Sequence, residues 1–316
     1  MSKKDVKSPV PMKSLSQGSE VNQADDSKHK ATNVGGGGGD SKPSKALFSP
    51  LLVRVDGGDG GSDAPADDEE KDDVEEDDDA ADDNEDVFNP YYFIAGLPPH
   101  ASVTRDLVCL PPQIEVFGNL PLASKPTLVL DLDETLVHCT VEPIEKPDLV
   151  FPVSFNGTMY DVYVRKRPYL DYFLETVSRS FEVVVFTASQ KVYADVLLDL
   201  LDPERKYIKH RLFREACLLV QGNYLKDLSV LGRDLSRTVL VDNSPHAYGY
   251  QIDNGIPIES WFDDDADTEL LKLLGFLRQV FATDDVRPIV RDHFKTFRLI
   301  LDASRGISVC LSAPPF

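Results

Sequence analysis

The stretch that most constrains the fold is Leu128–Thr135, in which a short apolar run is followed by carboxylates at alternate positions. The run Leu128–Leu130 is typical of a strand that is buried on both faces of a parallel sheet. Asp131, Asp133 and Thr135 follow at two-residue spacing, so in an extended chain their side chains point the same way. Two ionised carboxylates this close repel each other, and a hard cation such as Mg²⁺ would relieve that repulsion.

The apolar runs Glu182–Phe186 and Thr238–Val241 predict two further strands of the same kind. The polar residues that follow these runs are Thr187, Asp242 and Asn243. The carboxyl ends of parallel strands lie along one edge of an open α/β sheet, where ligands bind. An isolated Asp-x-Asp would suit a solvated strand exit equally well, but three such strand ends, with Lys226 between the last two, favour a site.

Helical patterns separate these strands. They are predicted to open at Arg167-Pro168 and to cover Gln190–Leu201, Thr268–Phe281 and Val286–Leu299. The runs Val150–Phe155 and Thr158–Val164 are separated by Asn-Gly, which is a strong hairpin signal. The predicted fold class is therefore α/β, a Rossmann-like parallel sheet flanked by helices, with a small β-hairpin insertion after the first of these strands.

Residues 1–86 are predicted to form a disordered low-complexity tail, Gly-rich at first and then acidic. The last part, Asp63–Asp86, is about two-thirds Asp and Glu, and such a block repels itself and stays extended. It is either a solubilising tail or a regulatory segment that binds basic partners. The apolar stretch Ala46–Val55 is either a docking motif or a piece that folds back on the body.

Ordered structure is expected from residue 87 onward. Segment 87–123 is aromatic and Pro-rich and is predicted to wrap the outside of the folded part. The folded domain is predicted at 124–300, followed by a C-terminal tail at 301–316.

Composition limits the classes of function. The chain has a net charge of −21, of which residues 1–88 carry roughly −13, and an acidic chain is a poor ligand for nucleic acid. The four cysteines form no Cys-x-x-Cys pair, so neither a zinc ribbon nor a redox motif is indicated. No secretory signal is recognisable, and no apolar run reaches the ~18–20 residues that span a bilayer. We therefore expect a soluble monomer with no nucleic-acid or membrane partner.

Four short motifs of this chain can be compared with the motifs of known protein families. They are Asp-Leu-Asp-Glu-Thr at 131–135, Phe-Thr-Ala-Ser at 186–189, Tyr-Leu-Lys-Asp-Leu at 224–228 and Val-Asp-Asn-Ser-Pro at 241–245. In this order they resemble the motifs of the haloacid-dehalogenase (HAD) superfamily. Over about 124–291 the chain is similar to the small RNA polymerase II C-terminal-domain (CTD) phosphatases, most of all to the CTD small phosphatase-like protein 2 branch. The resemblance identifies 124–300 as an FCP1-homology phosphatase domain.

The resemblance implies an Mg²⁺-dependent protein serine/threonine phosphatase that acts through an aspartyl-phosphate. Asp131 would attack phosphorus, and Asp133 would protonate the leaving oxygen and then activate water. Thr187 and Lys226 would hold the phosphoryl oxygens. The implied metal ligands are Asp131, the Asp133 backbone carbonyl and Asn243.

Some roles implied by the resemblance stay open. Asp242 would either support the metal site or orient Lys226. Thr135 and Arg214 would lie at the substrate phosphate. A hydrophobic slot for a substrate proline would be lined by Val141, Val153, Phe155 and Val162, which could instead be the core of the insertion. Gln190 stands where the family has an aliphatic pocket residue, and this departure weakens a strict preference for the polymerase tail.

Each residue also has an ordinary structural interpretation. Thr187 alone would be a helix N-cap, Lys226 a solvated lysine and Arg214 an ion-pair partner. The alternative function is a catalytically silent scaffold that keeps the fold, although both aspartates of the first motif are present. We expect a phosphoserine or phosphothreonine protein as substrate, either the polymerase tail or another Ser-Pro phosphoprotein. Residence is expected to be nuclear, with cytoplasmic residence also open.

Overall fold

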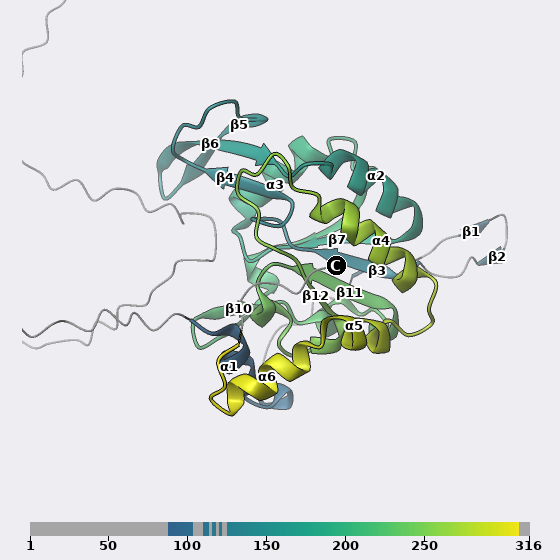
Figure 1. Cartoon of the computed structure of the whole chain (residues 1–316). Helices are drawn as coiled ribbons and strands as arrows, with labels where there is room; N and C mark the ends of the chain where they lie inside the picture. Colours follow the sequence, from purple (N-terminus) through teal and green to yellow (C-terminus); the bar gives the residue numbers. More distant parts are fainter. Residues whose placement is uncertain (1–87, 104–109, 114–115, 118–119, 122–124, 310–316) are drawn as a thin grey trace, which may run out of the picture. The chain divides into compact units, whose positions relative to one another are not determined.

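A computed structural model describes residues 88–103, 110–113, 116–117, 120–121 and 125–309 of the chain (Figure 1). The tail predicted at 1–86, with its stretch Ala46–Val55, lies outside the described residues. Most of the C-terminal tail predicted at 301–316 is described, up to residue 309.

The domain is built on a five-stranded parallel sheet with the strand order β12-β11-β3-β7-β8. The strands are β3 (Thr127–Leu130), β7 (Glu182–Phe186), β8 (Ile208–Leu212), β11 (Thr238–Asp242) and β12 (Gly255–Pro257). The three strands predicted from apolar runs are β3, β7 and β11, which lie side by side with β3 in the middle. The predicted parallel α/β fold is confirmed.

Alternate residues of β3 face two different cores, as the period of a strand requires. Leu128 and Leu130 belong to a core that includes buried residues of α2 (Leu170–Ser180), α3 (Lys191–Leu201), α4 (Glu269–Phe281) and α5 (Val286–Phe294). Val129 packs instead with Leu228 and Tyr248, which lie in the 3₁₀ segments η4 (Leu228–Leu231) and η6 (Pro245–Tyr248). The sheet is therefore covered on both faces, and its strand ends are free to carry the site.

The insertion after β3 is a three-stranded antiparallel sheet in the order β4-β6-β5. Its strands are β4 (Val137–Thr140), β5 (Leu149–Phe155) and β6 (Thr158–Lys166). The predicted hairpin is confirmed, and both turn residues, Asn156 and Gly157, have positive φ, as a tight hairpin turn needs. β4 was not predicted from the sequence, and its pairing with β6 completes this small sheet.

A single helix over Val286–Leu299 was predicted, and this prediction is wrong. Lys295 has a φ of 55°, a left-handed conformation that separates α5 from α6 (Thr296–Ser304). The break allows α6 to lie beside α1 (Pro90–Ala95), with which it packs (Figure 1). The domain boundary predicted at residue 300 therefore falls inside a helix.

Eight short elements complete the described fold. They are β1 (Val116–Phe117), β2 (Leu120–Pro121), β9 (Leu218–Val220), β10 (Asn223–Leu225), η2 (His100–Ser102), η3 (Arg214–Ala216), η5 (Leu235–Arg237) and η7 (Ile252–Asn254). β9 and β10 form an antiparallel pair, and β10 leads directly to Lys226.

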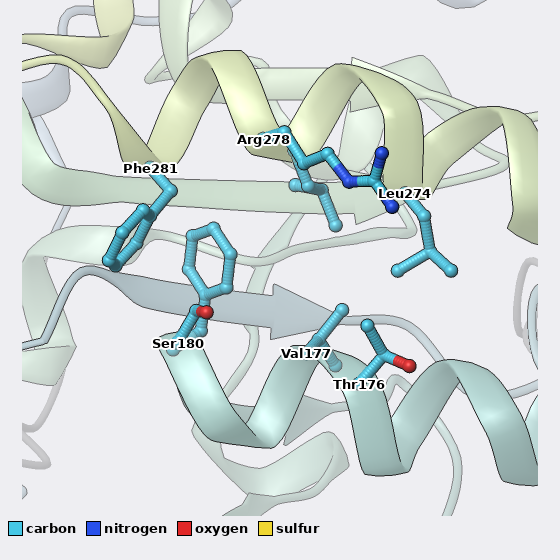
Figure 2. Close-up of a pocket in the computed structure, with 8 residues that line it drawn as sticks. Thr176, Val177, Ser180, Leu274, Arg278 and Phe281 are labelled. Carbon is cyan, nitrogen blue, oxygen red and sulfur yellow. The ribbon is translucent and has the colours of Figure 1, made fainter.

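α2 and α4 leave a small apolar groove between them (Figure 2). It is lined by Val177, Phe181, Leu274, Leu277 and Phe281, among others. The last residues of α2 lead into the start of β7, so the groove lies toward the amino-terminal edge of the sheet, away from the predicted site. Within the part of the chain that the structure describes, no helix combines the length and the apolar character needed to cross a membrane.

Candidate active site

The ends of β3 and β11 meet at one edge of the sheet, because the two strands are parallel neighbours in register. Asp131, the first residue after β3, donates its backbone N–H to Val241 O at 3.0 Å. Asp242 is the last residue of β11. Thr187 follows β7, the other neighbour of β3, and donates its N–H to Leu212 O at 3.0 Å. The topology thus places the three predicted strand-end residues on one edge.

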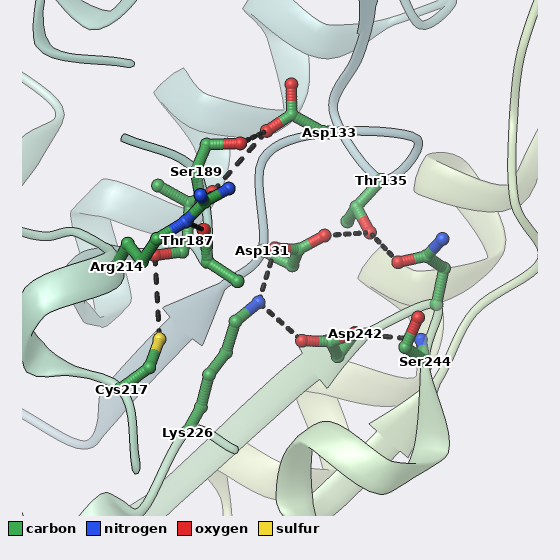
Figure 3. Close-up of polar contacts among 12 residues, drawn as sticks. Asp131, Asp133, Thr135, Thr187, Ser189, Arg214, Cys217, Lys226, Asp242 and Ser244 are labelled. Carbon is green, nitrogen blue, oxygen red and sulfur yellow. Dashed lines mark hydrogen bonds and ion pairs between the residues drawn. The ribbon is translucent and has the colours of Figure 1, made fainter. Parts of the chain in front are cut away.

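Lys226 joins two of these strand ends (Figure 3). Its ammonium group donates to Asp131 Oδ1, and to Asp242 Oδ2 at 2.5 Å. The second oxygen of Asp242 accepts the Ser244 N–H at 2.8 Å. The lysine backbone is fixed as well, since its N–H donates to Ala247 O at 2.7 Å. Both oxygens of Asp242 are engaged in these contacts, which favours the role of orienting Lys226 over that of a metal ligand.

Burial sets the charge state of this group. Burial raises the pKa of Asp131 to about 8, and the positive charge of Lys226 offsets only part of that rise. Burial opposes the charge of Lys226 too, but Asp131 and Asp242 together raise its pKa above the ordinary value. Lys226 therefore stays an ammonium ion at neutral pH, and a cation bound against Asp131 would favour the ionised carboxylate.

Asp133 is held by hydroxyl groups instead of an ammonium. Its Oδ2 accepts from Ser189 Oγ at 2.7 Å and from Thr187 Oγ1 at 3.4 Å, and its Oδ1 accepts from Tyr193 OH at 2.6 Å. Burial raises the pKa of Asp133 to about 6, with a contribution from the nearby charge of Glu134. Asp131 and Asp133 are therefore neighbouring carboxylates in two different environments.

Oxygen atoms suited to a hard cation lie beside Asp131. Thr135 Oγ1 is 3.1 Å from Asp131 Oδ2 and 3.4 Å from Asn243 Oδ1. Asn243 Nδ2 donates to Ser260 Oγ at 2.9 Å, which turns the amide oxygen toward Thr135. Among the residues that the structure describes, no three His, Cys, Asp or Glu side chains form a metal-binding group. A carboxylate, an amide oxygen and a backbone carbonyl do suit Mg²⁺, which keeps several of its water ligands.

Arg214 comes to the same edge from η3. Its backbone N–H donates to Ser189 O at 3.0 Å, and its Nε donates to Ala188 O at 2.6 Å. The guanidinium carbon lies 5.0 Å from the centre of the Tyr224 ring. Figure 3 shows Arg214 beside Thr187. This placement is compatible with contact to a substrate phosphate.

The predicted slot residues differ in exposure. Val153 and Val162 are only 2% and 1% exposed and belong to the main core, whereas Val141 and Phe155 are half-buried against it. Two of the four residues therefore form the core of the insertion, which was the alternative interpretation. Gln190, at the predicted departure from the family, is the N-cap residue of α3 and makes no side-chain capping bond.

Sequence reasoning missed several residues of the site. Tyr193 and Ser189 hold Asp133, and Ser260 orients Asn243. The sequence indicates Ser189 only as the last residue of the motif Phe-Thr-Ala-Ser. No local pattern of the sequence pairs the Tyr193 hydroxyl with a carboxylate. The N-cap interpretation of Thr187 does not hold, because Thr187 Oγ1 accepts the Ser189 N–H at 2.9 Å and α3 is capped at Gln190.

The site lies in a parallel α/β domain with a small insertion after the first strand of the sheet, as the sequence predicts. Residues 126–287, about half of the chain, match the model of the family described as "NLI interacting factor-like phosphatase". The chain belongs to this family. The resemblance drawn from the four motifs is confirmed.

Known proteins give the same placement. The chain is 54% identical over 216 residues to "CTD small phosphatase-like protein 2" of Dictyostelium discoideum, covering 68% of this chain but only 37% of that protein. It is 44% identical over 203 residues to the human "Carboxy-terminal domain RNA polymerase II polypeptide A small phosphatase 1", covering 62% of this chain and 77% of that protein. Among solved structures, Fcp1, titled "an essential RNA polymerase II CTD phosphatase", matches with a TM-score of 0.40 and 18% identity, over 60% of this chain and 68% of that one.

Proposed function

We propose that this protein is an Mg²⁺-dependent protein serine/threonine phosphatase that works through an aspartyl-phosphate on Asp131. The observation that carries the proposal is the meeting of Asp131, Asp133 and Lys226 at the edge of a sheet in a phosphatase family. Splitting the hydrolysis into two displacements replaces one difficult step by two easier ones.

In the first step, a carboxylate oxygen of Asp131 attacks phosphorus and the seryl or threonyl oxygen leaves. Lys226 lies against Asp131 and places its charge where negative charge develops on the phosphoryl oxygens. Asp242 keeps that ammonium in place through its bond of 2.5 Å. Thr187 lies on the neighbouring strand end, where its groups can face the same oxygens.

Asp133 serves as the acid and then as the base. Burial raises its pKa to about 6, close to the range in which a group both gives and takes protons at neutral pH. The proton of Asp133 goes to the leaving oxygen in the first step. In the second step the carboxylate takes a proton from water, which attacks the phosphorus of the aspartyl-phosphate and regenerates Asp131.

Asp131, the Asp133 backbone carbonyl and Asn243 would hold Mg²⁺. When bound, the ion supplies positive charge that offsets the repulsion between the carboxylates and the phosphate. Asp242 acts through Lys226 in this proposal.

The proposed substrate is a phosphoserine or phosphothreonine in a protein segment, such as the RNA polymerase II tail or another Ser-Pro site, and the proposed residence is nuclear. The name of the human relative supports this substrate class. The burial of Val153 and Val162 and the presence of Gln190 argue against a slot identical to that of the family.

The test is turnover of p-nitrophenyl phosphate by the full chain, with Mg²⁺ and with EDTA. Wild type should be active only with Mg²⁺, and Asp131→Asn should lower kcat at least about 10³-fold while remaining folded. Asp171→Asn, the same chemical change at an exposed position on α2, is the matched control and should be as active as wild type. A wild type without Mg²⁺-dependent turnover would favour the silent scaffold, and an active Asp131→Asn would remove the nucleophile from Asp131.

A further inference from the structure

A buried aspartate next to Lys226 takes no part in the proposed chemistry. Asp227 is 1% exposed. Its Oδ1 accepts the Ser229 N–H at 2.9 Å and Gln251 Nε2 at 3.0 Å. Its Oδ2 accepts a hydrogen bond from His100 Nε2. The residue that follows the lysine is thus fixed by donors from three separate parts of the chain.

His100 belongs to a segment, residues 88–103, that lies before the family match at 126–287 and is called the N-terminal brace below. The brace packs tightly on the chain after η6. A Cβ added at Gly249 would lie 2.7 Å from Leu97 Cδ1, so the two segments approach each other closely at this glycine. Tyr250 OH donates to Pro98 O at 3.1 Å, and the rings of Tyr250 and His100 are 4.8 Å apart.

The brace contacts two of the segments that deliver groups to the site. His100 reaches Asp227, which follows Lys226. The rings of Phe88 and Phe93 pack on His246 in η6, with centroids 5.4 and 6.0 Å away. η6 itself begins two residues after Asn243. The two contacts are connected through the backbone, because the Lys226 N–H also donates to Ala247 O in η6.

We propose that His100 is a positioning residue for Lys226. Its hydrogen bond to Asp227 fixes the backbone from which the lysine side chain reaches Asp131 and Asp242. A charged group that stabilises a transition state must be placed within a fraction of an ångström, so freedom at its neighbour lowers the rate. The N-terminal brace is then part of the catalytic unit. This inference rests on the proposed phosphatase function.

The test compares kcat and KM of full-length variants on p-nitrophenyl phosphate with Mg²⁺. His100→Ala should lower kcat roughly tenfold or more and change KM less than about twofold, because Lys226 acts mainly in the transition state. The His100 side chain is 42% exposed, so the fold should survive its removal. His100→Gln, which keeps a nitrogen donor at a similar reach, should retain most of the wild-type kcat.

Tyr92→Ala is the matched control, since Tyr92 lies in the same brace and is 66% exposed. It should leave kcat unchanged. A folded His100→Ala with wild-type kcat would overturn the inference while leaving the phosphatase function intact. A folded His100→Gln that loses as much kcat as His100→Ala would also overturn the inference. If His100→Ala does not fold, a tenfold loss of kcat in a folded His100→Gln would overturn it as well. An inactive wild type would overturn both proposals.

Discussion

At the residue scale, the two aspartates of the first motif are distinguished by their neighbours. Asp131 meets the Lys226 ammonium, whereas Asp133 meets hydroxyl groups of Ser189 and Tyr193. Burial raises the pKa of Asp131 to about 8 although Lys226 lies beside it, so this carboxylate needs the further positive charge of a bound cation to be the ionised nucleophile. A buried carboxylate among hydroxyls, with its pKa raised to about 6, suits a proton carrier. The environments thus support the proposed division of roles.

Tyr193 should matter most when the leaving group needs a proton. Tyr193→Phe removes the hydroxyl that donates to Asp133 Oδ1 at 2.6 Å and keeps the ring that stacks on Phe151 at 6.3 Å. General acid catalysis is typically worth 10²–10⁴-fold, and misplacing the acid should cost part of it, about tenfold in kcat on a phosphoserine peptide. On p-nitrophenyl phosphate, whose leaving group departs as a stable anion, the loss should stay below about threefold.

Steady-state kinetics on both substrates, with the same enzyme preparations, measures this difference. Phe151→Leu, which changes the packing of the ring but keeps the Tyr193 hydroxyl, is the comparison for a purely structural effect. Equal losses on the two substrates in Tyr193→Phe would contradict a role in positioning Asp133.

At the element scale, the sequence predicted the strands that a local apolar pattern marks. β3, β7 and β11 follow from their apolar runs, and the convergence of their ends follows from parallel topology. β4 is a short stretch that pairs with β6, and the helix that follows the left-handed Lys295 packs on α1. These contacts join distant parts of the chain, so no local pattern reveals them.

The same division holds for the site. Asp131 and Asp133 could be found from sequence because their spacing after a strand is itself the signal. Tyr193 and His100 reach their partners across 60 and 127 positions of the chain. Only the folded arrangement pairs them with Asp133 and Asp227.

The opposite ends of the same strands carry a stabilising cluster. Glu182, the first residue of β7, accepts from Arg233 Nε at 2.8 Å and from Thr127 Oγ1 at 3.0 Å at the start of β3. Gln113 Nε2 donates to Glu182 Oε2 at 2.5 Å, and His210 Nε2 of β8 lies 3.2 Å from Glu182 Oε1. One carboxylate thus joins the starts of β3 and β7 to β8 and to the segments that carry Gln113 and Arg233.

This cluster predicts a pH-dependent contribution to stability. Burial works to raise the pKa of Glu182, but hydrogen bonds from Arg233 and Gln113 outweigh it and lower the pKa below its usual value. A lowered pKa in the folded state stabilises the protein above the unfolded pKa of about 4.3, and the contribution is lost as pH falls through the folded value. Glu182→Gln should therefore cost about 2 kcal/mol at pH 7 and progressively less at acid pH.

Urea unfolding of both proteins at pH 7 and near pH 3.5 measures this difference. Glu175→Gln, which removes an exposed carboxylate paired with Arg179 on α2, is the control and should cost less than about 0.5 kcal/mol. A gap between Glu182→Gln and wild type that does not narrow at acid pH would contradict a contribution from the charge of Glu182.

At the scale of the whole molecule, the two edges of the sheet are charged differently. At the amino-terminal edge the buried carboxylate Glu182 is paired with Arg233. At the catalytic edge Asp131, Asp133 and Asp242 are buried with Lys226 as the ammonium between two of them. Burying this excess of carboxylates costs stability, as the raised pKa values of Asp131 and Asp133 show. Ligands that neutralise the catalytic edge should therefore stabilise the entire domain.

Beryllofluoride with Mg²⁺ should show this coupling, because the pair mimics a phosphorylated aspartate and binds only the folded site. A ligand at 100 times its Kd adds about 2.7 kcal/mol, which for a domain of this size raises Tm by roughly 5–10 °C. Thermal unfolding of the full chain measures the shift, with Mg²⁺ and fluoride but no beryllium as the control. Asp131→Asn lacks the carboxylate oxygen that beryllium needs and should show no beryllium-dependent rise. An equal rise in wild type and Asp131→Asn would mean that the ligand binds elsewhere, and that Asp131 does not link the chemistry of this edge to the stability of the fold.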